Sequence, residues 1–90
     1  TVVIKLLQRF VDSKQAEIEE LIEKVNEIDR EELLAKLHNL KGMLGNLGAE
    51  SLHQMSGKLE SEFKQGQFPK GLFNDWKEDV LRLVSAIKSL

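Results

Sequence analysis

Residues 37–49 read LHNLKGMLGNLGA and place a leucine repeat beside a histidine, His38. The leucines recur at the three- and four-residue steps of one helix face, at Leu37, Leu40, Leu44 and Leu47. Two glycines, Gly42 and Gly45, interrupt this helix, although each costs roughly 0.5–1 kcal/mol relative to alanine. A third, Gly48, stands where a left-handed residue commonly follows a helix end. The stretch therefore predicts a helix that keeps two unfavourable residues near its histidine.

A helical wheel places the histidine and the glycines together, away from the leucines. At about 100° per residue, His38 lies roughly 140° from Leu33, and Gly42 and Gly45 lie within roughly 40° of His38. Lys41 falls at the edge of the leucine face, toward the histidine. Neutral imidazole is a nucleophile near neutral pH, and an ammonium one turn away can contact an anion carried on the ring. We therefore expect an exposed imidazole in a surface cleared by glycines.

The remainder of the chain also shows helical periodicity. Apolar residues recur at helical spacing over about residues 2–28, 29–48, 49–64 and 69–90, and no sustained alternation supports strands. Within the first segment a lysine falls in the apolar stripe, and good N-cap residues stand beside it. This segment is therefore either one kinked helix or two helices divided near Asp12.

Local signals mark the helix starts and the connections. Asp29 followed by Glu32 has the outline of a capping box, and Pro69 suits the first position of a helix. Residues 65–67, Gln-Gly-Gln, suit the connection before it. Amphipathic helices with such short connections predict an all-α fold, an antiparallel up-down-up-down four-helix bundle spanning residues 1–90 as a single domain.

Composition excludes several classes of function. The net charge of −2, with acids and bases interspersed, gives no basic footprint for nucleic acid. No apolar run approaches the ~20 residues that span a bilayer, so we expect no membrane contact by this domain. Cysteine is absent, which excludes thiolate chemistry. The chain begins at Thr1 rather than methionine, which suggests a domain excised from a longer protein.

The residues around the histidine resemble a known family signature. Residues 38–42, His-Asn-Leu-Lys-Gly, followed by residues 45–49, Gly-Asn-Leu-Gly-Ala, resemble the H-x-x-K-G pattern of histidine-containing phosphotransfer (HPt) domains. The resemblance implies that His38 is the phosphoacceptor, that Lys41 contacts the phosphate, and that Gly42 leaves space beside the ring. It also implies the four-helix bundle that the periodicity predicts independently.

The family implies a phosphorelay carrier in two-component signalling. His38 would take a phosphoryl group from a receiver-domain phosphoaspartate and pass it to another receiver, with Gly42 and Gly45 forming the docking surface and Gly48 ending the helix. The partners would be receiver domains of response regulators or of a hybrid kinase. We expect a cytoplasmic monomer without a cofactor and, lacking an ATP-binding loop, without enzyme activity. The domain would either stand alone or end a hybrid sensor histidine kinase, and the parent kinase would be anchored in the inner membrane.

One position departs from the family pattern, and two other functions remain open. The family often has small residues where this chain has Met43 and Leu44, so we expect altered packing rather than lost activity. The domain could instead be a non-catalytic helical interaction module. A metal-binding bundle is a weaker alternative, because Glu50 and His53 have a Glu-x-x-His spacing but Ala35 occupies the matching position before His38. We expect no metal, with His53 either at the surface or on the shoulder of the apolar stripe.

Overall fold

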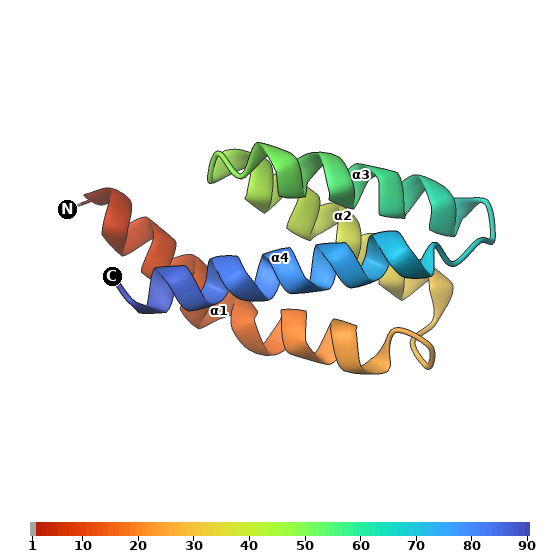
Figure 1. Cartoon of the computed structure of the whole chain (residues 1–90). Coiled ribbons are helices and arrows are strands. Elements are labelled where there is room, and N and C mark those ends of the chain that lie inside the picture. The colour runs from red at the N-terminus through yellow and green to blue at the C-terminus, as the bar shows by residue number, and fades with distance from the viewer. Residues whose placement is uncertain (1) are drawn as a thin grey trace.

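The computed structural model describes residues 2–90 and consists of four helices joined by short connections (Figure 1). These are α1 (Val2–Lys24), α2 (Arg30–Asn46), α3 (Glu50–Lys64) and α4 (Lys70–Lys88). Successive helices run in opposite directions in a bundle with principal extents of 42 × 22 × 20 Å. No strand occurs within the described residues. The predicted antiparallel four-helix bundle is therefore confirmed.

One hydrophobic core runs between the helices and receives side chains from all four. Its fully buried large apolar side chains are Trp76, Ile18, Leu21, Leu37, Leu44, Leu59 and Val80. Burying an apolar side chain of this size contributes about 1.5–3 kcal/mol. Four leucines of α2, from Leu33 to Leu44, are buried, and Leu47 packs against the core while half-buried. The leucine repeat therefore fixes which face of α2 points inward.

Helix α1 is continuous across Asp12, so the alternative of two separate helices is wrong. Figure 1 shows that the helix axis changes direction after its first turns. The Ser13 hydroxyl donates to the backbone carbonyl of Arg9 at 2.9 Å, a local bond that often bends a helix. The helix ends at Lys24 rather than Ile28, because the following residues form a turn.

Two predicted helix starts need correction. Asp29 is the N-cap of α2, but its side chain makes no capping hydrogen bond, so the capping box with Glu32 is wrong. Pro69 is the residue before α4 rather than its first residue, which is Lys70. The end of α2 is as predicted, because Gly48 has a φ of 81° and follows the last turn. Only glycine adopts that conformation at little cost.

The tight link after α2 brings α3 back along it, and these two helices form the most extensive pair in the bundle. His38, the histidine predicted to be functional, lies on α2 beside this contact with α3. Among residues 2–90, no helix combines the length and the apolar composition needed to cross a bilayer.

Candidate functional site

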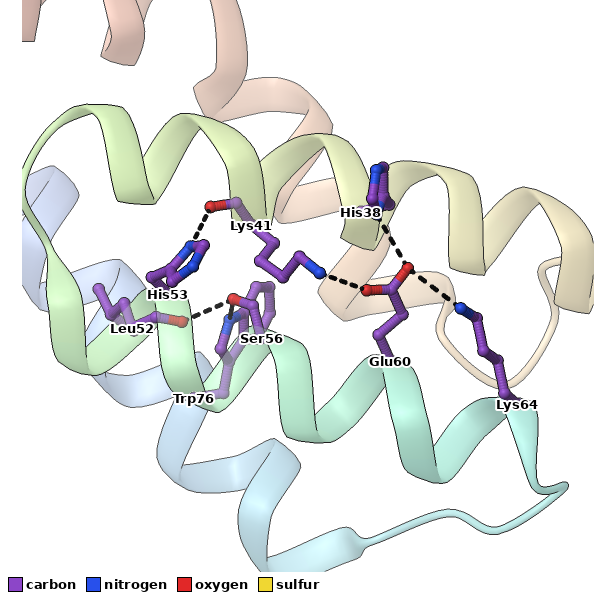
Figure 2. A network of polar contacts seen from close by, with 8 residues as sticks. All are labelled: His38, Lys41, Leu52, His53, Ser56, Glu60, Lys64 and Trp76. Atoms are coloured by element: carbon purple, nitrogen blue, oxygen red, sulfur yellow. Dashed lines mark hydrogen bonds and ion pairs between the residues drawn. The ribbon is translucent and has the colours of Figure 1, made fainter.

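His38 projects from the exposed side of α2. Its side chain is 64% exposed, whereas the adjacent Leu37 is fully buried. The helical wheel therefore placed the histidine correctly with respect to the core. The ring is not isolated, however, because its Nδ1 atom lies 3.1 Å from Oε2 of Glu60 on α3 (Figure 2).

Glu60 is the centre of the polar network and was missed by the sequence analysis. Its carboxylate is 9% exposed and contacts three cationic or titratable side chains from two helices. Besides His38, Nζ of Lys41 lies 3.0 Å from Oε1, and Nζ of Lys64 lies 3.8 Å from Oε2. The available sequence signal was weak: an acidic residue directly follows Leu59, at the edge of the apolar stripe of α3.

The ionised form of Glu60 is favoured despite its burial. Desolvation raises the pKa of the carboxyl, but the hydrogen bond and charge of Lys41, followed by those of His38, outweigh it and hold the pKa below its ordinary value. Glu60 is therefore a carboxylate at neutral pH, and it accepts hydrogen bonds from His38 and Lys41.

An ionised carboxylate fixes the protonation of the His38 ring. A carboxylate can only accept hydrogen bonds, so the contact with Glu60 requires the proton to be on Nδ1. In the neutral imidazole the other nitrogen, Nε2, then carries the free lone pair. The exposed His38 ring therefore has its Nδ1 atom bound to the buried Glu60 carboxylate, and its Nε2 atom is available for reaction.

The aliphatic stem of Lys41 crosses α3 at a glycine. A Cβ atom added to Gly57 would lie 3.7 Å from Cδ of Lys41, so the stem passes close above the α3 backbone. The Lys41 side chain is 28% exposed and directs its ammonium to Glu60. The lysine of the signature and the histidine thus meet on one carboxylate, as Figure 2 shows.

The two glycines inside α2 have different surroundings, and one prediction is wrong. Gly42 is exposed, and a Cβ there would meet nothing within 4 Å. A Cβ on Gly45 would lie only 2.8 Å from Nδ1 of His53, so this position faces α3 rather than open space. The expectation that both glycines clear an exposed surface therefore holds for Gly42 alone.

His53 explains why residue 45 is a glycine. The ring is half-buried over Gly45, and Nδ1 donates to the backbone carbonyl of Lys41 at 2.8 Å. His53 therefore occupies a shoulder position, one of the two predicted for it, and joins α3 to α2. Within residues 2–90, no three His, Cys, Asp or Glu side chains are grouped so that they could hold a metal ion.

A buried hydrogen-bond chain fixes α3 one turn from Glu60. Nε1 of Trp76 on α4 donates to the hydroxyl of Ser56 at 2.8 Å, and that hydroxyl donates to the carbonyl of Leu52 at 2.7 Å. Both side chains are fully buried. Because Ser56 and Glu60 are four residues apart on one helix, this chain sets the position of the carboxylate.

The bundle and the site define a class: a small all-α protein that displays an exposed histidine, whose ring contacts a buried carboxylate on the neighbouring helix. The sequence model of the Hpt domain matches residues 5–88, and the chain belongs to this family. No curated protein and no solved structure gives a significant match. Hpt domains are phosphotransfer carriers of two-component signalling systems and interact with receiver domains of response regulators.

Proposed function

We propose that His38 is the phosphoacceptor of this domain and that Nε2 is the atom phosphorylated. The observation that supports this assignment is the contact between Nδ1 and the buried Glu60 carboxylate, 3.1 Å long, beneath a ring that is 64% exposed. The other histidine, His53, is half-buried, and its Nδ1 is engaged with the backbone of α2. His38 is therefore the better candidate.

The donor is the phosphoaspartate of a receiver domain. The Nε2 lone pair attacks the phosphorus, a P–N bond forms, and the acyl-phosphate P–O bond breaks with its electron pair returning to the aspartate carboxylate. Nδ1 keeps its proton throughout, so the ring gains positive charge as the new bond forms. Glu60 stabilises that charge, as a buried carboxylate does for the histidine of a serine-protease triad. The reverse sequence passes the group to a second receiver.

Lys41 and Gly42 have supporting roles in this proposal. The Lys41 ammonium lies on the same carboxylate as the ring, so it can also contact the oxygens of a phosphoryl group bound to Nε2. Gly42 leaves the surface beside the histidine open, where a receiver can bring its own backbone close. Gly45 contributes only the edge of this docking surface, because His53 covers its other side.

Phosphorylation by a labelled receiver tests the assignment. The wild-type domain is expected to acquire acid-labile label, His38→Gln is expected to acquire none, and His53→Gln, which removes the other histidine, is expected to keep it. Because the His38 side chain is mostly exposed, circular dichroism is expected to show an unchanged helix content in His38→Gln. Label retained in this variant would disprove the assignment. Receiver binding without any transfer to the wild type would instead support a non-catalytic interaction module.

A further inference from the structure

His53 on α3 contacts α2 at Lys41, the residue proposed to bind the phosphoryl oxygens. Its Nδ1 atom donates to the backbone carbonyl oxygen of Lys41 at 2.8 Å, and the half-buried ring lies over Gly45. In an α-helix the carbonyl of residue 41 points toward the N–H group of residue 45, so a donor from a neighbouring helix reaches this oxygen by lying over position 45. A Cβ atom on Gly45 would lie 2.8 Å from Nδ1, closer than side chains pack. The hydrogen bond therefore depends on both the histidine and the glycine.

The Lys41 side chain crosses the same interface in the opposite direction. Its Cδ atom lies 3.7 Å from the position of a Cβ atom on Gly57, and its Nζ atom lies 3.0 Å from Oε1 of Glu60. Figure 2 shows His53 reaching α2 and Lys41 reaching α3 side by side. The backbone and the ammonium of Lys41 are therefore both held by α3.

These contacts share one register between the two antiparallel helices. Along α2 they involve residues 38, 41 and 45, and along α3, read backward, their partners are residues 60, 57 and 53, at the same steps of three and four. One residue advances a helix by about 1.5 Å, so a slip of one residue would give each side chain a different partner. Because the pair of His53 and Gly45 involves neither the His38 ring nor the Glu60 carboxylate, it can fix this register without occupying the phosphate site.

We propose that His53 is a positioning residue for phosphoryl transfer, which binds the Lys41 carbonyl and thereby places the Lys41 ammonium beside the phosphoryl group on His38. This inference rests on the proposed function of His38. His53 acts through the backbone of α2 and leaves the acceptor nitrogen unchanged. Its loss should therefore lower the rate of phosphorylation, while every His53 variant still acquires its label on His38.

The test measures the rate at which phosphoramidate phosphorylates each protein, followed by ³¹P NMR. This small donor needs no docking surface: Nε2 of His38 forms the new P–N bond as ammonia leaves. His53→Ala removes the ring and the donor, whereas His53→Phe keeps a ring without a donor. Both are expected to slow phosphorylation about two- to tenfold, which corresponds to the loss of one net hydrogen bond.

Two further variants serve as rescue and control. His53→Asn keeps an amide that can donate from the position of Nδ1, so it is expected to restore most of the rate. Gln54→Ala changes the next residue of α3, which is exposed and whose amide donates to Glu50 on the same helix. This control is expected to match the wild type. Slowing in His53→Asn equal to that in His53→Ala would disprove a role for the hydrogen bond.

A kinetic double-mutant cycle distinguishes positioning of Lys41 from a general loss of structure. In a Lys41→Ala background the ammonium is absent, so adding His53→Ala is expected to cause no further slowing. Equal slowing with and without the Lys41 side chain would disprove the proposal, as would a His53→Ala rate equal to that of the wild type, and His38 would remain the acceptor in both cases. If His53→Ala lacks the helix content of the wild type by circular dichroism, His53→Phe takes its place in the cycle. A wild-type protein that takes no label on His38, from phosphoramidate or from a receiver, would instead overturn the proposed function itself.

Discussion

Nδ1 of His38 on α2 lies 3.1 Å from Oε2 of Glu60 on α3, which stands 22 residues later in the chain. The two groups differ in exposure, since the ring is 64% exposed and the carboxylate only 9%. The buried Glu60 carboxylate therefore orients the exposed His38 ring. The contact directs Nε2 outward and makes Glu60 the first residue to test after the histidine.

Replacing Glu60 by glutamine tests the orientation of the ring. The glutamine amide keeps the size of the side chain but removes the charge that stabilises a phosphorylated, positively charged ring. Its NH₂ group can also donate to Nδ1, which leaves the proton on Nε2 and blocks attack. We expect phosphoryl acceptance to slow about tenfold or more, by analogy with carboxylates that orient catalytic histidines. The initial rate of labelling by a phosphorylated receiver measures this, with the exposed Glu78→Gln on α4 as the control. An unchanged rate would exclude this role for Glu60.

Acid should reduce the contribution of Glu60 to stability. The pKa of this carboxyl is held below its ordinary value of 4.5, so its stabilising contribution is complete above that value and is lost as the pH falls through the lower folded-state pKa. The free energy of unfolding of the wild type, relative to that of Glu60→Gln, should therefore decrease as the pH falls below 4.5. Urea unfolding of both proteins at a series of pH values measures the difference. A difference that is constant or grows toward low pH would contradict the lowered pKa.

Alanine substitutions at the two glycines of α2 should have different effects on the free energy of unfolding. Gly42→Ala should increase the free energy of unfolding by about 0.5–1 kcal/mol, because the new Cβ meets open space and alanine favours the helix. Gly45→Ala should not show this increase in the free energy of unfolding. Its Cβ displaces the His53 ring and breaks the bond to the Lys41 carbonyl, which costs about 0.5–1.5 kcal/mol. Thermal and urea unfolding of the two variants measure the contrast.

A double-mutant cycle identifies the cause of that contrast. In a His53→Ala background the ring is absent, so Gly45→Ala should regain the stabilisation expected of alanine in a helix. The same penalty with and without His53 would show that another feature of position 45 requires glycine.

Removing the Ser56 hydroxyl should destabilise the bundle without changing its surface. Ser56→Ala leaves Nε1 of the buried Trp76 without its acceptor, which costs about 1–3 kcal/mol. The exposed Ser61→Ala on the same helix should change stability little. Denaturant unfolding followed by tryptophan fluorescence measures both. A stability of Ser56→Ala equal to that of the wild type would mean that Trp76 finds another partner.

The sequence determined the helices and the faces they present. The 3.6-residue period of the leucines places Leu37 and Leu44 in the core and His38 outside it, because residues on one helix keep their angular relationship whatever the helix packs against. The same local reasoning predicts Gly48 after the end of α2, where a positive φ is needed. The resemblance of the histidine motif to the Hpt family also depends only on neighbouring residues.

The tertiary structure decided which side chains from different helices meet. Glu60 contacts His38 because the core shared by the four helices fixes the rotation and the axial position of α3 on α2, which the period of a single helix does not encode. The same packing places His53 over Gly45, so a glycine that a wheel assigns to the surface is covered by another helix. Periodicity thus identified the exposed histidine, whereas the charge environment of its ring arose only when α3 packed against α2.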